Sequence, residues 1–512
     1  MEGKNGGINW SVLWKSDDWM SVWIGFLILA VFMAGLTMAL PGWKWVGDGS
    51  FQGKIAGWTT KVAAIATEAE GKNEPAVKVQ AAALKTALEG KDRKVIGAEA
   101  AKLETAAKAA KDKDFQKKAA KFASGIKGDA GNSIAKVFSG GNLLKALYLL
   151  IALGILGVVG VAFMGMPVAK FIAGFPVIFI LSALAYFISA NNIITHYGLE
   201  VVFWALIFGL LISNTVGVPD WMKAAIKTEF FIKIGLVLLG AEVLFGTIAK
   251  VGAYGMVQSV LVIALVFYFC LWVARKIGLD DEFAAILGTA VSVCGVSAAI
   301  AAGGAVKGDP KKVSHAISLV LLCAIPMLIL QPLFAKWVGM SPAVTGAWIG
   351  GTIDTTGAVV AAGAIAGEEA MAVAVVVKMA QNVLIGVMAF LLAFWFVFKG
   401  QSATGEKPGL MEIWIRFPKF VLGFIIASIV FSFFMSEAQA KDVTNVTKGL
   451  RGWWFTLAFL CIGLDTKFKE LVAMGGGKPA AVFLIAQAFN ILLTLLLAYL
   501  IFGGVLFPVP VF

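Results

Sequence analysis

The sequence predicts an all-α polytopic membrane protein with about 11–13 transmembrane segments, inverted repeats and two discontinuous helices that cross near the midplane. The first observation is composition: apolar residues make up 59% of the 512-residue chain and charged residues only 14%, against roughly 25% charged residues in a soluble domain. The second is a close succession of apolar stretches, and the third is an interruption in two of them. A chain this apolar cannot cover a water-exposed surface, which excludes a disordered chain, a disulfide scaffold and a soluble nucleic-acid-binding protein.

Residues 1–41 are predicted to form an N-terminal transmembrane helix. Their apolar stretch starts at Met20 and ends near Leu40, which is about the 20 residues needed to cross the hydrocarbon core. Three tryptophans precede it, at positions 10, 14 and 19, and tryptophan is enriched at membrane interfaces. A cleaved signal peptide is the alternative, but it would need a basic start and a small-residue cleavage site. The segment therefore favours a retained helix.

Residues 42–141 are predicted to form a soluble, Ala/Lys-rich helical insert. The segment holds 18 Lys and Arg against 11 Asp and Glu, so it carries +7 of the chain's net charge of +12. Alanine, lysine and glutamate favour helix, and glycines interrupt the segment. We expect a short helical hairpin or a three-helix appendage that serves as a solvated spacer. Its positive charge suits an anionic lipid surface, and we expect no nucleic-acid partner.

Residues 142–512 are predicted to be the membrane domain. Four cysteines and two histidines lie far apart along the chain without a CxxC pair, so neither a metal site nor a disulfide framework is predicted. With residues 20–40, the candidate spans number thirteen, each near the ~20 residues that a crossing needs. The other twelve are 143–165, 167–190, 197–213, 229–248, 253–275, 282–304, 313–336, 343–365, 370–398, 417–435, 452–472 and 480–505.

An internal repeat is visible within this domain. Leu239–Phe245 aligns with Ile462–Phe468 without a gap, and each copy carries an acid three positions before the phenylalanine. The two spans lie seven apart in the order of candidates, an odd separation that reverses direction across the membrane if every intervening segment crosses. Such inversion is typical of secondary transporters. Chance similarity between two leucine-rich segments is the alternative.

Two candidate spans, 282–304 and 343–365, carry glycine and hydroxyl residues at their centres. Glycine weakens helical continuity, and nearby hydroxyls can bond the backbone groups that a break sets free. Broken helices present half-helix N-termini at the midplane, where they attract anions. Close packing through small residues is the alternative, but packing does not call for a carboxylate such as Asp354. The candidate site residues in these segments are Ser292, Cys294, Gly295 and Ser297 in the first and Thr352, Asp354, Thr355, Thr356 and Gly357 in the second.

Lys378 is the strongest single signal, because a charged residue stands in the middle of an apolar span. A lysine at the bilayer centre costs about 2.5–3.5 kcal/mol on insertion scales. Gln381 and Asn382 follow at helical spacing and favour a polar cavity, and Asp354 is the natural charge partner. The alternative is that the lysine extends to the interface, since Glu368 lies ten residues upstream.

At these residues the chain resembles the YeiH-type family, whose name assigns it to sulfate export. The motifs are Cys294–Ala298, Gly350–Gly363 and Val377–Lys378, and the resemblance covers approximately residues 170–505. It implies a relation to the cation/proton antiporters and bile-acid symporters, with two broken helices crossing at the midplane. Two positions depart from the family pattern: Asp354–Thr355 stands where a histidine and an acid are expected, and Gln381 where a basic residue often occurs.

We therefore expect a secondary active transporter of a small anion, such as sulfate or a related oxyanion or sulfonate, coupled to H⁺ or Na⁺. The alternative is a cation/proton exchanger, and an enzyme is not expected. Apart from a coupling Na⁺ no cofactor is expected, and the expected partners are the anionic substrate, the bilayer of a bacterial inner membrane and a second copy in a homodimer. The substrate-binding candidates are Lys378, Ser292, Cys294, Gly295, Ser297, Thr355, Thr356, Gly357, Gln381 and Asn382, and the ion-coupling candidates are Asp354 and Thr352.

Loop charge leaves one conflict in this scheme. The basic segments Lys307–Lys312 and Lys399–Arg416 both favour the cytoplasmic side. Three candidate spans separate them, which would place them on opposite sides. A re-entrant segment would remove the conflict.

Overall fold

The computed structural model describes residues 11–196, 200–398, 414, 417–469 and 477–510. These residues form helices and no β-strand, with one isolated β-bridge between Trp45 and Asn191. In chain order the helices are α1 (Val12–Lys15), α2 (Asp17–Met33), α3 (Asp48–Gly71), α4 (Pro75–Gly90), α5 (Arg93–Lys108), α6 (Lys113–Gly131), α7 (Ile134–Val137), α8 (Gly140–Phe163), α9 (Val168–Ser189), α10 (Asn192–His196), α11 (Val201–Thr215), α12 (Asp220–Lys223), α13 (Thr228–Gly240), α14 (Phe245–Ile277), α15 (Asp281–Ser292), α16 (Val296–Val306), α17 (Pro310–Val338), α18 (Pro342–Thr352), α19 (Thr356–Ala366), α20 (Glu368–Phe398), α22 (Lys419–Phe433), α23 (Glu437–Asp465) and α25 (Lys478–Phe502).

Among the described helices, six are long and apolar enough to cross a membrane: α8, α9, α14, α17, α20 and α25. Shorter apolar helices accompany them, namely α11, α16, α19 and α22. The chain is therefore an all-α, multi-pass membrane protein, as its composition predicts.

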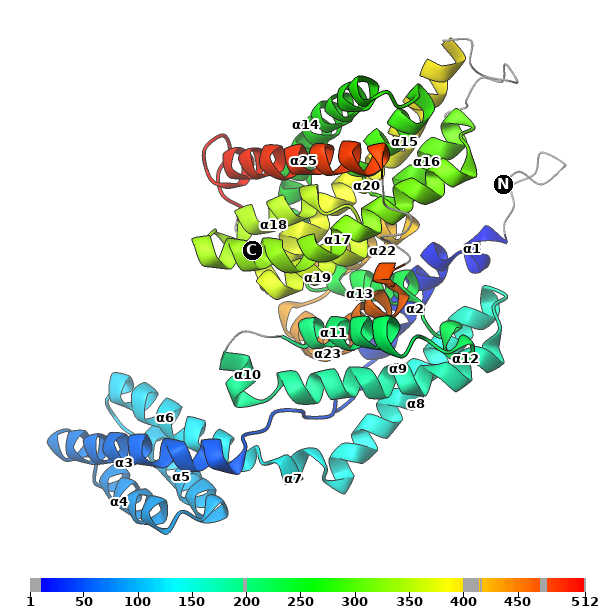
Figure 1. The fold of residues 1–512 in the computed structure, drawn as a ribbon. Coiled ribbons are helices and arrows are strands. Elements are labelled where there is room, and N and C mark those ends of the chain that lie inside the picture. Colours follow the sequence, from blue (N-terminus) through cyan, green and yellow to red (C-terminus); the bar gives the residue numbers. More distant parts are fainter. Residues whose placement is uncertain (1–10, 197–199, 399–413, 415–416, 470–476, 511–512) are drawn as a thin grey trace. The chain divides into compact units, whose positions relative to one another are not determined.

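The chain divides into two compact units. One unit comprises Ala39–Ala152 and Tyr186–Val201, and it contains the predicted insert 42–141. There α3–α6 pack around their own core, which combines alanines with larger apolar side chains such as Phe51 and Phe115 (blue to cyan in Figure 1). The appendage thus has four helices, not the hairpin or three helices that the sequence predicts. The fourth is α3, whose glycines do not interrupt it.

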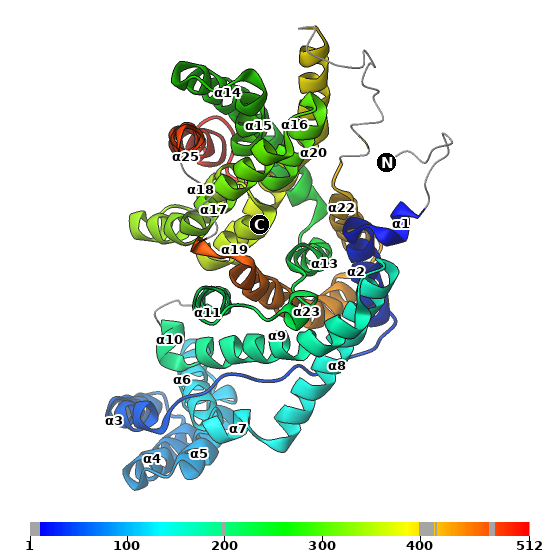
Figure 2. The same cartoon turned by 45° about the vertical axis from the view of Figure 1, so that its right-hand side comes forward.

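The other unit comprises Met1–Met38, Leu153–Ala185 and Val202–Phe512, and it holds both interrupted segments. In the first of these, α15 ends at Ser292 and α16 begins at Val296. The start of α15 lies beside the end of α16, because the Asp309 amide donates to Glu282 Oε1 at 2.7 Å. Gly295 allows the reversal, with a φ of +49° that few other residues adopt. We call this pair hairpin 1; its two helices lie side by side in Figures 1 and 2.

The second interrupted segment is also a hairpin, formed by α18 and α19. Both ends of this segment pack against the start of α20: a Cβ on Gly346 would lie 2.4 Å from the Ala370 carbonyl oxygen, and a Cβ on Gly363 would lie 2.8 Å from Met371 Cα. Such close approach requires glycine at both positions. We call this pair hairpin 2, and its tip lies at residues 353–355.

The predicted interruptions are confirmed, but the segments do not cross the membrane as discontinuous helices. Each half has only 11 or 12 residues and rises about 17 Å, little more than half of the ~30 Å hydrocarbon core. Each hairpin therefore returns to the side from which it enters. Two of the thirteen candidate spans are therefore re-entrant hairpins.

The two hairpins enter from opposite sides of the membrane. Helix α17 leads from the base of hairpin 1 to the base of hairpin 2, and α20 leads back, so that Phe396 packs in one cluster with Phe283 of α15. Only two crossings thus separate Lys312 from the end of α20. This placement removes the loop-charge conflict, since the basic segment 399–416 follows α20 directly; apart from Trp414, that segment lies outside the described residues.

The two copies of the sequence repeat lie at the ends of antiparallel helices. Thr228, at the start of α13, bonds Asp465 at the end of α23, whereas Glu242, just after α13, bonds Arg451 in the middle of α23. The helices that end in the repeat therefore point in opposite directions. This is the relation that an inverted repeat requires.

Candidate functional site

Four helix ends meet where the two hairpin tips approach each other. Cys294 of hairpin 1 lies with its Sγ 3.9 Å from Thr356 Oγ1 of hairpin 2. A Cβ on Gly295 would lie 3.0 Å from the Cβ of Asp354, so only glycine fits at this contact. The predicted approach of the two breaks is confirmed. The N-termini of α16 and α19 and the C-termini of α15 and α18 thus converge.

Lys378 of α20 lies directly behind these tips, with only 1% of its surface exposed. Its Nζ donates to the Val293 carbonyl oxygen and to Gln381 Oε1, each at 2.7 Å. The ammonium group therefore stays in the protein interior and does not extend to the interface. It stabilises the C-terminal end of α15, where free carbonyl groups carry negative partial charge.

The predicted ion pair between Lys378 and Asp354 is wrong. Within the described part of the chain no ion pair joins them, and Asp354 Oδ2 is buried without a hydrogen-bond partner. The ammonium group donates instead to the carbonyl of Val293 and the side-chain amide oxygen of Gln381. The sequence shows that both residues are charged, but it does not show which helix ends lie next to each of them.

Side-chain amides bond the remaining carbonyl groups at the tips. Gln381 Nε2 donates to the Ser292 oxygen at 2.9 Å and lies 3.4 Å from that of Gly351. On α25, Gln487 donates to the Thr352 oxygen at 3.1 Å, and Asn490 Nδ2 donates to that of Val291 at 3.0 Å. These last two amides are not among the site residues predicted from the sequence. Their three-residue spacing within an apolar span is the signal that they share one face with the site.

Four polar atoms at the tips are buried without a hydrogen-bond partner among the described residues: Ser292 Oγ, Asp354 Oδ2, Asn382 Oδ1 and Gln487 Oε1. The amide nitrogen of Asn382 does have a partner, Thr356 Oγ1, at 3.0 Å. A buried polar atom left unpaired costs about 1–3 kcal/mol. Such atoms gathered at one place are typical of a site that takes up a proton, an ion or a water molecule.

A cavity of about 830 Å³ reaches the tips. The first turns of α16 and α19 form part of its wall. Backbone N–H groups in a first turn lack partners within the helix, and in α19 that of Ala358 is bonded to Thr355 Oγ1 at 3.3 Å. Of the predicted site residues, Cys294, Ser297, Thr355, Thr356 and Gly357 line the cavity. The others lie behind this wall: Ser292, Gly295, Thr352, Asp354, Lys378, Gln381 and Asn382.

The rest of the cavity wall carries charges that the sequence did not single out. Lys233 of α13 is nearly buried, and its Nζ lies 2.7 Å from both Asp17 Oδ2 and Asp18 Oδ1 of α2. The N-terminal helix, predicted as a separate segment, therefore contributes to the site. The sequence signal that could have identified Lys233 is its position within an apolar span. The charged lining residues are Asp17, Asp18, Glu229, Lys233, Lys419 and Asp465.

Comparison with known proteins places the chain in a family. Residues 173–482 match the family model described as conserved hypothetical protein 698. The chain belongs to this family. The matched part contains both hairpins, α17 and α20, whereas α2 and the insert lie outside it.

The chain is similar to several membrane proteins of the UPF0324 group. It is 44% identical to one from Rhodopirellula baltica over 66% of this chain and 64% of the relative, and 42% identical to one from Nitratidesulfovibrio vulgaris over 70% and 64%. The UPF0324 inner membrane protein YeiH of Escherichia coli is 26% identical, over 65% of this chain and 92% of YeiH. The predicted YeiH-type resemblance is confirmed. The alignment spans less than two thirds of the first two relatives, and no solved structure matches the chain.

Proposed function

We propose that the protein is a secondary active transporter of the bacterial inner membrane that carries a small anion, such as sulfate or a related oxyanion or sulfonate. One observation carries the proposal: two re-entrant hairpins meet inside the membrane and present the N-termini of α16 and α19 to one cavity. Re-entrant backbone at membrane depth is tolerated where it is buried or lines a polar cavity. Transporters use such interrupted helices to hold their substrates.

The two N-termini supply the positive potential for an anion. Each helix N-terminus contributes up to about 2 kcal/mol to a partly buried negative charge. Two such ends directed at one anion therefore reinforce each other. The hydroxyls of Ser297, Thr355 and Thr356 line the same wall and can donate to oxyanion oxygens. Lys378 adds positive charge from behind the tips, as a positioning residue for α15.

The cavity reaches only one side of the membrane. It is lined by Thr228 and Lys233 from the first half of α13, but by no residue near the end of that helix. At the other end of α13, Arg451 forms ion pairs that join this helix to α20. Its Nε lies 2.8 Å from Glu242 Oε1 and its Nη2 lies 2.9 Å from Glu368 Oε2. One open and one closed side is the arrangement that alternating access requires.

We infer from basic residues that the open side faces the cytoplasm. Glu368 begins α20 at the base of hairpin 2, so the open end of the cavity lies toward the base of hairpin 1. That base carries Arg275, Lys276, Lys307, Lys311 and Lys312, and short basic loops remain in the cytoplasm. We infer that the structure represents the inward-open state.

Asp354 is our candidate for the coupling site. Its unpaired Oδ2 at the tip of hairpin 2 can accept a proton or bind Na⁺. Thr352, the second predicted coupling residue, uses its hydroxyl within α18, where it donates to the Trp348 oxygen at 2.6 Å. We therefore assign the coupling ion to the Asp354 carboxylate and the helix-end carbonyls beside it.

A cation/proton exchanger is the second candidate. It is favoured by the excess of carboxylates in the cavity wall, where Asp17, Asp18, Glu229 and Asp465 outnumber Lys233 and Lys419. In that case Asp354 would exchange its proton for Na⁺. Neither candidate involves a chemical reaction, and we propose no enzymatic activity; a homodimer in the bilayer is our proposed assembly.

Uptake of radiolabelled sulfate into proteoliposomes tests the proposal. The purified chain is compared under an inward pH gradient, a Na⁺ gradient and no gradient, with a sulfonate as competitor. We expect gradient-driven uptake that the competitor reduces and that Lys378→Ala abolishes, with the exposed Lys250→Ala as control. Na⁺-driven proton movement without anion uptake would establish the exchanger and overturn the anion assignment.

A further inference from the structure

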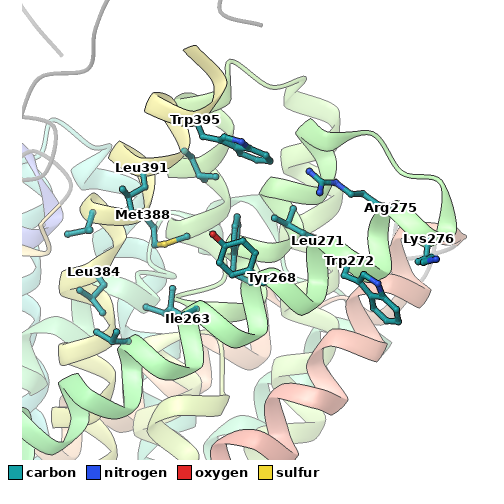
Figure 3. A pocket seen from close by; sticks show the side chains of 15 residues that line it. Ile263, Tyr268, Leu271, Trp272, Arg275, Lys276, Leu384, Met388, Leu391 and Trp395 are labelled. Atoms are coloured by element: carbon teal, nitrogen blue, oxygen red, sulfur yellow. The ribbon is translucent and has the colours of Figure 1, made fainter. Parts of the chain in front are cut away.

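A second cavity, of about 810 Å³, lies between α14 and α20. Its wall is apolar along most of its length, and Figure 3 shows the side chains that line it. Along α20 it runs from Leu384 to Trp395, a rise of about 16 Å. This length is close to the hydrocarbon depth of one leaflet, which is about 15 Å. The cavity is therefore a groove of the depth that one lipid chain occupies.

The groove is open to the surroundings of two membrane-spanning helices. Tyr268 and Trp272 of α14 are 71% and 58% exposed, and Leu391 of α20 is 53% exposed. Both helices are long and apolar enough to cross the membrane, so large apolar side chains exposed on them contact lipid, not water. The surrounding lipid therefore supplies acyl chains that match the apolar wall of the groove.

One end of the groove is basic and aromatic. Arg275 and Lys276 stand in the last turn of α14, and Figure 3 shows Trp395 of α20 next to Arg275 across the groove. The guanidinium carbon lies 5.9 Å from the Trp395 ring centroid. Arg275 Nε is bonded to Asp281 at 2.9 Å, whereas Lys276 has no ion-pair partner among the residues that the structure describes. This end therefore offers uncompensated positive charge at the headgroup level.

We propose that this groove binds an anionic phospholipid, whose acyl chain lies along Leu384 and Met388 and whose phosphate contacts Arg275 and Lys276. Basic pockets between transmembrane helices on the cytoplasmic side bind anionic headgroups. The positive loops at the base of hairpin 1 place this end of α14 in the cytoplasmic leaflet, where anionic lipids are found. The basic end of the groove, its length and its place in the cytoplasmic leaflet all favour an anionic phospholipid as the ligand.

The lipid connects to the site through Ile263. This residue lines the groove and also belongs to the apolar cluster that holds Val293 and Cys294 at the tip of hairpin 1. An acyl chain in the groove packs against the back of that cluster. The bound lipid therefore stabilises the tip of hairpin 1, whatever species the first cavity carries.

Native mass spectrometry and thermal unfolding of the purified full-length chain test this inference. After delipidation, the protein is titrated with dioleoyl phosphatidylglycerol and, separately, with dioleoyl phosphatidylcholine. Arg275→Gln/Lys276→Gln removes the two charges, Ala264→Trp fills the groove, and Lys250→Gln at the other end of α14 is the matched control. The first two variants leave the residues of the transport site unchanged, so failure here is separable from failure of the proposed function.

We expect phosphatidylglycerol to bind and raise the melting temperature of the wild type and of Lys250→Gln, and phosphatidylcholine to do so much less. The charge variant should bind about 30-fold more weakly, which is the loss of about 2 kcal/mol expected for two cations near a membrane surface. Ala264→Trp should lose the lipid altogether. Equal binding of both lipids, or undiminished binding by both variants, would overturn the proposal. Conversion of a dimer into a monomer by Ala264→Trp would overturn it too, because a second copy would then cover the groove.

Discussion

Lys378 donates a hydrogen bond of 2.7 Å to the backbone carbonyl oxygen of Val293. A buried cation on α20 thereby caps the C-terminal end of α15, 85 residues away in the sequence. The lysine is thus coupled to the conformation of hairpin 1. Any movement of the tip changes the environment of the charge, and any change in the charge alters the support of the tip.

Replacement of Lys378 by alanine should abolish transport and lower the melting temperature. The change leaves the Val293 oxygen and Gln381 Oε1 without their donor, at about 1–3 kcal/mol for each buried unpaired group. Lys250→Ala, an exposed lysine on α14, should change neither property. Unfolding by circular dichroism and uptake into proteoliposomes measure both effects. Wild-type transport by Lys378→Ala would show that the cap is not needed.

Asp354→Asn should uncouple transport without destabilising the protein. Asp354 Oδ2 has no partner among the described residues, so removal of the charge breaks no ion pair and relieves a buried carboxylate. We expect uptake that no longer responds to a pH or Na⁺ gradient and a melting temperature equal to or above that of the wild type. A large fall in melting temperature would instead indicate a structural ion pair. Asp442→Asn, on the exposed surface of α23, is the control.

Arg451→Gln should open the closed side of the membrane. The arginine is 3% exposed and holds Glu242 after α13 and Glu368 on α20. Its loss breaks this link between the two helices and leaves Glu368 with only the longer contact to Lys448, at 3.9 Å. The measurement is labelling of Cys294, which lines the cavity, with a membrane-impermeant thiol reagent after replacement of the other three cysteines by alanine. We expect labelling from the cytoplasmic side in the parent protein and from both sides in Arg451→Gln. If labelling from the outside does not increase, Arg451 is not the barrier.

The insert 42–141 should be dispensable for transport. Its helices α3–α6 have a core of their own, and none of its residues lines the cavity at the hairpin tips. A chain in which a flexible linker replaces the insert should insert into the membrane and take up substrate at a rate close to that of the wild type. Complete loss of uptake by a correctly inserted, folded variant would contradict this.

The amino-acid sequence by itself determined that the protein lies in a lipid bilayer and where two of its helices are interrupted. Apolar stretches of about 20 residues specify membrane helices because lipid leaves the backbone no other partner than itself. Glycine at 295 and hydroxyls around 292 and 355 marked both interruptions, since helix continuity depends on local residues. Lys378 stood out for the same kind of reason, because the cost of a charge in an apolar span is readable from the span alone.

Only the tertiary structure decided the direction in which the chain continues after each interruption. A break reads the same whether the second half crosses the membrane or returns, and the difference lies in close contacts such as Gly346 with Ala370 and Asp309 with Glu282. The partner of Lys378 was decided in the same way. Opposite charge favoured Asp354 as the partner of Lys378. The free carbonyl groups at a helix end, however, belong to the backbone and cannot be identified from residue types. One of them, at Val293, accepts the hydrogen bond from the ammonium group.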